Sequence, residues 1–242
     1  MSPPARLDAS RAVWITRAEP GAAGTAARVA ALGLEPLVLP LLETVDLPEA
    51  AGALGGEGPL AFTSANGVRA FARLSPRRSG PVYVVGPATA AAARSAGFAD
   101  IRPGADIRPG AGDVEALARR ILADAPPGEV LHAAAREPAG DLVGRLLASG
   151  RPARRVAVYA ARETRPTAAQ LEEALAAPVV LAHSPRAGRI LAVHLAPLAS
   201  RPAVLGLSPA CLAPLEDLDL PARTAPDRPL ESDMLNLLAS LR

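Results

Sequence analysis

Short apolar runs alternate along this chain with stretches in which apolar residues recur every three or four positions. The apolar runs predict strands at residues 12–16, 36–42, 60–63, 82–85, 130–134, 155–160, 179–182 and 203–207. The spaced stretches predict helices at residues 23–32, 68–74, 114–122, 142–148 and 168–175. Alternating strands and helices are typical of βαβ units, in which helices cover a parallel sheet. The pattern therefore predicts an α/β protein, and 242 residues are enough for two such domains.

One segment of the chain occurs twice with the same pattern. The segment LAFTSANGVRAF resembles VLAHSPRAGRIL, and in each an apolar strand ends in a serine, Ser64 or Ser184, before a helix. The strand that follows ends in a glycine, Gly86 or Gly206, and each glycine comes 22 positions after its serine. A repeat of this kind indicates two related halves.

A second pair of segments, TRAEPGAAG and AREPAGDLVG, also follows a strand and leads through a helix to a glycine and another strand. With this pair called A and the serine-glycine pair called B, the chain reads A, B, A, B. Either the first A packs with the last B and the middle segments form an inserted domain, or two A-B pairs stand in tandem. The repeat alone does not decide between these topologies.

Insertion requires the chain to cross between the domains twice, near residues 40–46 and 159–165. Both segments look extended, so we expect them to pair as a two-stranded link. The inserted arrangement places a discontinuous domain at residues 1–40 plus 164–242 and an inserted domain at residues 46–160, with linkers at about 41–45 and 161–163.

The hexapeptide ADIRPG occurs twice in succession, at residues 99–104 and 105–110. Each copy ends in Pro-Gly, which is a turn signal. We expect a duplication that is tolerated in a surface loop. The functional alternative is an enlarged loop at the mouth of a cleft, which would bring Arg102 and Arg108 to a ligand.

Composition excludes several classes of protein. The net charge is only +2 and no basic run carries interleaved aromatic residues, so no nucleic-acid partner is expected. Cys211 is the single cysteine, which excludes an intrachain disulfide and a cysteine-based zinc site. His132, His183 and His194 fall on different predicted elements, so no metal site is expected. The absence of a signal-peptide pattern and of any apolar run of about 18 residues predicts a cytoplasmic protein without a membrane partner.

Several predicted strands end in small or hydroxyl-bearing residues. In open α/β sheets, ligands bind at the carboxyl ends of strands, where helix N-termini present unpaired N–H groups. Any one such residue is explained as an ordinary helix N-cap, but repeated helix starts in two domains suit a ligand with many carboxylates. These segments are residues 16–17, 63–67, 86–89, 183–186 and 206–209.

The chain carries no P-loop pattern, no strand-end G-x-G-x-x-G and no G-x-S-x-G. An enzyme with this sequence is therefore expected to need neither a cofactor nor a covalent intermediate. Tyr159 stands out because it ends a predicted strand at the proposed crossing, although from the residues alone packing at a hinge is the favoured explanation. Arginines near strand ends can pair with carboxylates, although most arginines of an Arg-rich chain are simply solvated. These arginines are Arg17, Arg136, Arg162, Arg165, Arg186 and Arg189.

From about Val13 to Leu238, the chain resembles the uroporphyrinogen-III synthases in the order and spacing of several short segments. The resemblance implies two flavodoxin-like α/β domains with parallel sheets, one inserted into the other and joined by a two-stranded β-ladder. The inserted topology is thereby favoured. The matching segments are Ile15-Thr16-Arg17, Phe62-Thr63-Ser64, VGPATA from Val85, Val158-Tyr159, Ser184-Pro185 and Leu205-Gly206.

The resemblance also implies a reaction in tetrapyrrole biosynthesis, toward haem, cobalamin and chlorophyll. The substrate is then hydroxymethylbilane, whose acetate and propionate arms are held largely by backbone amides in a cleft between the domains. Loss of the terminal hydroxyl as water leaves an azafulvenium cation, ring D is attacked at its substituted carbon, and the spirocyclic intermediate recloses as uroporphyrinogen III with ring D inverted. A tyrosine at the position of Tyr159 is the family's favoured candidate for assisting departure of the hydroxyl.

The family pattern further implies no cofactor and no metal, a monomer, and hand-off of the substrate from hydroxymethylbilane synthase. The expected substrate-binding residues are Thr16, Arg17, Ser64, Ala65, Gly86, Ala88, Thr89, Arg136, Ser184, Arg186, Arg201, Gly206 and Ser208.

Two positions depart from the family pattern. The family usually has Gly-Pro-Thr/Ala-Thr-Ala after the later strand, where this chain has GLSPA, so Pro209 takes the place of a common threonine and removes a hydroxyl and an N–H donor. His183 replaces the usual threonine or phenylalanine before Ser184. These departures keep open a non-catalytic tetrapyrrole-binding or regulatory relative on the same fold. A two-lobed small-ligand binding protein of another family is the third alternative.

Overall fold

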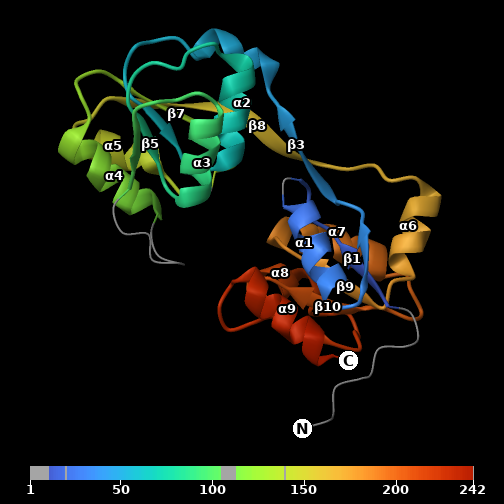
Figure 1. Ribbon diagram of the computed structural model, residues 1–242. Coiled ribbons are helices and arrows are strands. Elements are labelled where there is room, and N and C mark those ends of the chain that lie inside the picture. Colours follow the sequence, from blue (N-terminus) through green and yellow to red (C-terminus); the bar gives the residue numbers. More distant parts are fainter. Residues whose placement is uncertain (1–10, 20, 105–112, 139, 242) are drawn as a thin grey trace. The chain divides into compact units, whose positions relative to one another are not determined.

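The computed structural model describes residues 11–19, 21–104, 113–138 and 140–241 (Figure 1). By its internal contacts the chain divides into two units, called unit 1 and unit 2 below. Unit 1 comprises Met1–Glu43 and Arg162–Arg242, and unit 2 comprises Thr44–Ala161. The second unit is therefore an insertion in the sequence of the first. Within the described part of the chain, no helix combines the length and the apolar character needed to cross a membrane.

Unit 1 contains a parallel sheet of five strands among its described residues. The strands are β1 (Ala12–Ile15), β2 (Glu35–Val38), β9 (Val179–Ala182), β10 (Ala203–Gly206) and β11 (Arg223–Thr224). Their order is β11-β10-β9-β1-β2. Numbered within the unit, this order is 2-1-3-4-5, which is the flavodoxin-like order.

Helices cover both faces of this sheet (Figure 1). They are α1 (Ala22–Ala31), α6 (Ala168–Leu175), α7 (Pro185–Leu195), α8 (Pro209–Leu212), followed by a 3₁₀ turn at Ala213–Leu215, and α9 (Glu231–Ser240). Because successive strand residues point to opposite faces, each face has its own core. Ile15 packs with Val29 of α1 and Leu235 of α9 on one face, whereas Trp14 packs with Leu191 of α7 on the other.

Unit 2 contains a sheet with the order β3-β8-β7-β4-β5-β6. Its strands are β3 (Leu42–Asp46), β4 (Leu60–Phe62), β5 (Val82–Val84), β6 (Ile101–Pro103), β7 (Val130–Ala135) and β8 (Ala153–Glu163). Neighbours from β8 to β6 run parallel, and β4 lies in the middle of this series. Their order is 3-2-1-4-5, the other common doubly wound order. Each unit thus has a switch point where the winding reverses: between β1 and β9 in unit 1, and between β4 and β7 in unit 2.

Both faces of the unit 2 sheet are covered as well. The covering elements are the 3₁₀ helix Pro48–Ala53, α2 (Ala65–Leu74), α3 (Pro87–Ser95), α4 (Asp113–Asp124) and α5 (Leu142–Ala148). Phe62, Phe71 and Phe98 form an aromatic cluster between the sheet and the α2 side, with the first two ring centroids 5.5 Å apart. Tyr83 of β5 points to the other face and packs with Leu117 of α4.

The two crossing segments pair, as predicted. The N–H of Leu47 donates to the carbonyl of Val158 at 3.0 Å, and the N–H of Thr164 donates to the carbonyl of Leu41 at 3.1 Å, so β3 and β8 run antiparallel. Pairing of β1 with β9 and of β4 with β7 decides between the two topologies in favour of insertion. The predicted fold class, two α/β domains with parallel sheets, one inserted into the other and linked by a two-stranded ladder, is confirmed.

The expected strand at residues 36–42 is in fact two strands. β2 ends at Val38 and β3 begins at Leu42. Pro40 lies between them and has no N–H to donate, so the chain leaves the sheet of unit 1 at this point.

The first ADIRPG copy is a strand and not the expected surface loop. Its residues Ile101–Pro103 form β6, in which Arg102 lies opposite Tyr83 of β5. A proline is tolerated here because an edge strand is hydrogen-bonded on one side only. The second copy, with Arg108, lies outside the described residues.

The two copies of the serine-glycine segment align differently in the sheets than in the sequence. Leu60 of β4 lies opposite Val82 of β5, an offset of 22 residues. The equivalent strands β9 and β10 place Val180 opposite Val204, an offset of 24. The sheet register therefore shifts the second half of the repeat by two residues.

With this shift, the counterpart of Gly86 is Ser208 and not Gly206. Gly86 is the N-cap of α3 and Ser208 is the N-cap of α8, and both have extended backbones, with φ of −159° and −153°. Pro209 then matches Pro87, the first residue of α3. Both helices therefore begin with proline, at a position where an N–H has no intrahelical partner.

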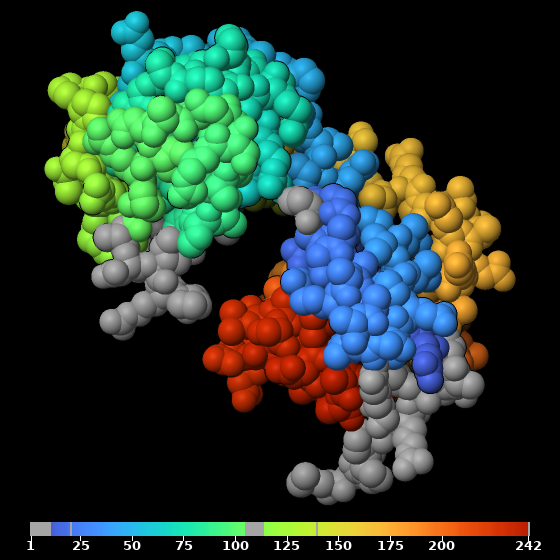
Figure 2. Space-filling view, in the orientation of Figure 1, coloured from blue at the N-terminus to red at the C-terminus, as the bar shows by residue number. Residues whose placement is uncertain are grey.

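A carboxylate at the start of α9 joins this helix to α1, and the two segments lie side by side in Figure 2 (red and blue). Glu231 accepts hydrogen bonds from Thr25, from Arg28 and, at 3.1 Å, from Arg17. Burial alone raises the pKa of Glu231, but the Thr25 hydroxyl and the two arginines outweigh it and lower the pKa below its ordinary value.

A substitution at Gly188 of α7 tests how closely α7 packs on α8. A Cβ at Gly188 would lie 2.1 Å from the carbonyl oxygen of Cys211, so Gly188→Ala is expected to lower the free energy of unfolding by about 2 kcal/mol. The matched control is Gly24→Ala in α1, where a Cβ would meet nothing closer than 3.9 Å. That change should stabilise by about 0.5–1 kcal/mol. Urea unfolding measures both, and equal effects would contradict the close approach of the helices.

Glu231 predicts a pH-dependent contribution to stability. Because its pKa is lowered on folding, its contribution is full above its ordinary pKa of about 4.5 and is lost as the pH falls through the folded value. Glu231→Gln should therefore cost about 2 kcal/mol at pH 7, and the difference from the unmodified protein should shrink below pH 4.5. Urea unfolding between pH 3 and 7 measures this, with exposed Glu173→Gln as the control. A difference that does not change with pH would show that charge is not the cause.

Candidate active site

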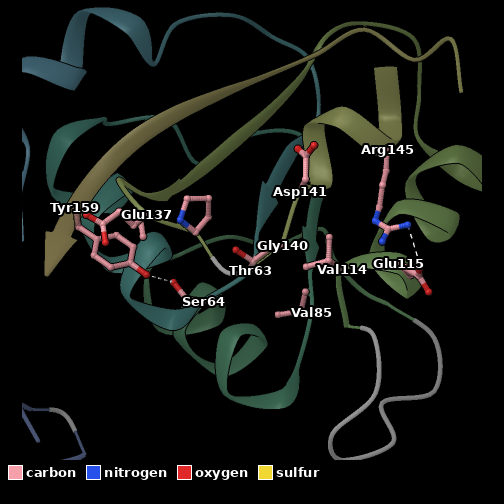
Figure 3. A pocket seen from close by; sticks show the side chains of 12 residues that line it. Thr63, Ser64, Val85, Val114, Glu115, Glu137, Gly140, Asp141, Arg145 and Tyr159 are labelled. Atoms are coloured by element: carbon pink, nitrogen blue, oxygen red, sulfur yellow. Dashed lines mark hydrogen bonds and ion pairs between the residues drawn. The ribbon is translucent and has the colours of Figure 1, made fainter. Parts of the chain in front are cut away.

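A pocket of about 590 Å³ opens at the switch point of unit 2 (Figure 3). Thr63 and Ser64 follow β4, Glu137 follows β7, and Tyr159 lies in β8. Parallel strands bring their carboxyl ends to one edge, so residues far apart in sequence meet here. The other lining residues are Val85, Val114, Glu115, Ala135, Pro138, Gly140, Asp141 and Arg145.

Ser64 and Tyr159 are hydrogen-bonded at one side of the pocket, with 2.8 Å between Oγ and the phenol oxygen (Figure 3). Ser64 is also the N-cap of α2, and its Oγ accepts the N–H of Gly67 at 3.0 Å. Glycine is needed at this first turn because a Cβ would lie 2.8 Å from the carbonyl oxygen of Ala133. The cap fixes the serine side chain, and the serine in turn fixes the phenol.

Thr63 contacts a buried histidine behind the pocket. Its Oγ1 lies 3.1 Å from Nε2 of His132, which is only 1% exposed on β7. Burial, assisted by the charge of Arg155 and opposed by that of Asp141, lowers the pKa of His132 to about 4. The imidazole is therefore neutral at neutral pH.

Carboxylates outnumber cations among the residues that line the pocket. Glu115, Glu137 and Asp141 carry negative charge, whereas Arg145 carries the one positive charge among the lining residues. Arg145 is paired with Glu115 at 2.8 Å (Figure 3). Asp141 caps α5 by accepting the N–H of Gly144 at 2.8 Å. The wall formed by these residues favours a positively charged or hydrogen-bond-donating ligand group.

The helix starts after β4 and β5 present N–H groups at the same edge of the sheet. Ala65 is the first residue of α2, and Gly86 is the N-cap of α3 without a side-chain hydrogen bond. The N–H groups of Ala88 and Thr89 have no hydrogen-bond partner among the described residues. Together with the positive end of the helix dipole, such groups suit an anion, whereas the Thr89 side chain itself is buried.

Arg136 is exposed and does not line the pocket. Its guanidinium donates to Glu49 at 3.2 Å, and its backbone N–H donates to the carbonyl of Tyr159 at 2.8 Å. The backbone of Arg136 therefore helps to hold Tyr159 in place.

At the switch point of unit 1, the expected ligands Thr16 and Arg17 are engaged with protein groups. The Thr16 hydroxyl is buried and donates to the carbonyl of Leu181 at 2.7 Å, and Arg17 donates to Glu231. Nε2 of His183 lies 3.4 Å from Glu231 without hydrogen-bond geometry. Burial, together with Arg17 and against Glu231, lowers the pKa of His183 to about 4.

The remaining expected ligands of unit 1 surround the starts of α7 and α8. Ser184 caps α7 through the N–H of Ala187 at 3.1 Å, as Ser64 caps α2, and Arg186 is the second residue of that helix. Gly206 is buried at the end of β10, and Ser208 is the N-cap residue of α8, without a side-chain hydrogen bond to the helix.

Arg201 lies at the opposite end of the sheet from these residues, before β10. Its guanidinium donates to the carbonyls of Leu195 and Ala196 at 3.0 and 2.9 Å, which caps the C-terminus of α7. The structure therefore does not bring Arg201 to the carboxyl edge where the other expected ligands lie.

Sequence reasoning named Ser64 and Tyr159, and the structure brings these two together. It did not name Glu137, Asp141 or the pairing of Thr63 with His132. Asp141 before a predicted helix carries an N-cap signal that could have been used. No sequence signal links Thr63 to His132, because their contact depends on the register of β4 against β7. No group of three or more metal-ligating side chains occurs among the described residues.

Comparison with known proteins agrees with this architecture. The uroporphyrinogen-III synthetase from Helicobacter pylori 26695 is 18% identical, with a TM-score of 0.65, over 96% of this chain and 100% of that chain. A mutant uroporphyrinogen III synthase from the extremely thermophilic bacterium Thermus thermophilus is 17% identical, with a TM-score of 0.50, over 95% of this chain and 98% of that chain. At these identities the likeness shows the fold alone.

The comparison with curated protein sequences gives no match. The profile of the family described as uroporphyrinogen-III synthase HemD matches residues 23–236, which is most of the chain. The chain therefore belongs to the uroporphyrinogen-III synthase family, HemD, the cyclising lyases of tetrapyrrole biosynthesis.

Proposed function

We propose that this chain converts hydroxymethylbilane, supplied by hydroxymethylbilane synthase, into uroporphyrinogen III, with loss of water and inversion of ring D through a spirocyclic intermediate. The observation that carries the proposal is the hydrogen-bonded pair of Ser64 and Tyr159 at the switch-point pocket of a chain of this family. Units 1 and 2 are proposed as the two domains of the enzyme.

In this proposal, Tyr159 assists the departure of the terminal hydroxyl. Ser64 Oγ already accepts the N–H of Gly67, so its own hydrogen is free to go to the phenol oxygen 2.8 Å away. The phenol O–H is then left to donate into the pocket, strengthened by the hydrogen bond that it accepts. A donor aimed at the leaving oxygen stabilises the negative charge that develops there.

The carboxylates that line the pocket also support the proposed reaction, because its intermediate is a cation. Loss of hydroxide leaves a positively charged azafulvenium, and fixed carboxylates nearby stabilise such a charge without reorganisation. Glu137 lies beside Tyr159, and Asp141 lies at the opposite side of the pocket (Figure 3). The same carboxylates repel the acetate and propionate arms, which directs the arms to the helix starts.

Binding of the arms provides the orientation that the reaction needs. The free substrate closes without inversion, so the protein has to hold ring D for attack at its substituted carbon. Backbone N–H groups at helix starts suit this task because they bind carboxylates at fixed positions. The proposed arm-binding residues are Ala65, Gly86, Ala88 and Thr89 in unit 2 and Thr16, Arg17, Ser184, Arg186, Gly206 and Ser208 in unit 1.

A coupled assay tests the activity directly. Hydroxymethylbilane is generated in situ, the protein is added, and the oxidised products are separated by chromatography into type I and type III isomers. We expect the type III isomer to dominate, and the reaction without the protein supplies the type I baseline. A product that stays at this baseline, together with tight porphyrinogen binding, would instead favour a non-catalytic tetrapyrrole-binding relative.

The two tyrosines of the chain provide a matched pair of variants. Tyr159→Phe removes the hydroxyl that faces the pocket and should lower the rate of type III formation about 100-fold without loss of the fold. Tyr83→Phe removes a hydroxyl that bonds Asp124 at 2.9 Å outside the pocket. It should cost about 1 kcal/mol of stability and leave the rate unchanged. Equal rates for both variants would remove Tyr159 from the catalytic mechanism.

A further inference from the structure

We propose that His132, as a neutral imidazole with its proton on Nε2, is a positioning residue that turns the Thr63 hydroxyl into a hydrogen-bond donor aimed into the pocket. The inference rests on the proposed function for the identity of the ligand, but the orientation of the hydroxyl does not depend on it.

The contact between Thr63 and His132 involves a polar ring that is buried within a sheet. His132 is 1% exposed, in the interior of a parallel sheet, where it lies opposite Ala61 of β4 on one side and Arg155 of β8 on the other. Its Nε2 lies 3.1 Å from Thr63 Oγ1, whereas Nδ1 has no hydrogen-bond partner among the described residues. A polar ring in such a position costs stability unless a contact or a function compensates for it.

Two neutral tautomers are compatible with the distance, and they have opposite consequences. With the proton on Nε2, the ring donates to Thr63, and Nδ1 is a buried acceptor without a partner. With the proton on Nδ1, a buried N–H donor is left without a partner, and Thr63 donates to the ring. Orphaned N–H groups are rarer than under-satisfied acceptors in protein interiors, so the first tautomer is favoured. The imidazolium form is disfavoured at neutral pH by burial and by the charge of Arg155.

The favoured tautomer determines what Thr63 offers to a ligand. One lone pair of Oγ1 is occupied by the ring N–H, and the hydroxyl hydrogen has no described acceptor within the protein. Because Thr63 lines the pocket, that hydrogen is available to an oxygen of the substrate. The polarised N–H of the imidazole strengthens the donor, as hydrogen bonds in a chain reinforce one another. Thr63 thereby adds a donor next to the pair of Ser64 and Tyr159.

The tautomer can be measured without any substrate. The chain has three histidines, so ¹⁵N spectra of the imidazole rings can be assigned with one variant for each. At neutral pH we expect His132 to show a protonated Nε2 and an unprotonated Nδ1. A protonated Nδ1, or protonation of both nitrogens, would overturn the proposal irrespective of the enzyme's activity.

Variants of the same two residues test the effect on the reaction. His132→Gln places an amide near the position of Nε2, whereas the shorter His132→Asn reaches only the position of Nδ1. The glutamine variant should therefore retain the rate of type III formation, and the asparagine variant and Thr63→Val should each lose about tenfold. The double variant Thr63→Val/His132→Asn should lose no more than either single variant. Melting temperatures are compared for all of them, and His194→Asn, outside the pocket, serves as the control for a histidine substitution.

The outcomes separate the inference from the proposed function. If the unmodified protein leaves the product at the type I baseline, the proposed function fails, while the imidazole spectrum still supports or overturns the orientation of Thr63. If the protein is active but the glutamine and asparagine variants lose the same amount, or the effects of Thr63→Val and His132→Asn add, the positioning role is overturned.

Discussion

The parallel pairing of β4 with β7 is the constraint on which the candidate site depends. It places Ala61 opposite His132 and so brings the carboxyl ends of the two strands to one edge of the sheet. The sheet order reverses at this pair, so the helices that follow the two strands lie on opposite faces and leave space between their starts. Thr63 and Ser64 reach that space from one strand and Glu137 from the other. The contact of Thr63 with His132 rests directly on this register.

Much of the architecture follows from local patterns in the sequence. Apolar runs and helical spacing identified most of the elements of both sheets, and the repeat identified Ser64 and Ser184 as equivalent helix caps, which the structure shows with the same geometry. The equal spacing from Ser64 to Gly86 and from Ser184 to Gly206 wrongly predicted that the two glycines are equivalent. Strand register is set by packing between strands and not by spacing along the chain. β6 was missed because its Pro-Gly ending resembles a turn.

Long-range polar contacts were beyond the reach of these patterns. Thr25 and Glu231 are 206 residues apart, and Thr63 and His132 are 69 apart. A polar side chain at the end of a strand or the start of a helix gives no indication of its partner, since the partner is decided by which elements the fold brings together. Tyr159 was identified through its position at the crossing, whereas its contact with Ser64 required the coordinates.

The two units share a sequence repeat, but the charged residues at their switch points differ. At the switch point of unit 1, Glu231 neutralises Arg17 and Arg28, and burial together with Arg17 keeps His183 uncharged. In unit 2 the switch point is an open pocket with carboxylates in excess. Thr44 and Ala161 bound unit 2 on paired antiparallel strands, so this unit begins and ends at one place in the structure. It can therefore be gained, lost or exchanged as a cassette, and a divergent second lobe is evolutionarily accessible without any strand of the first sheet being broken.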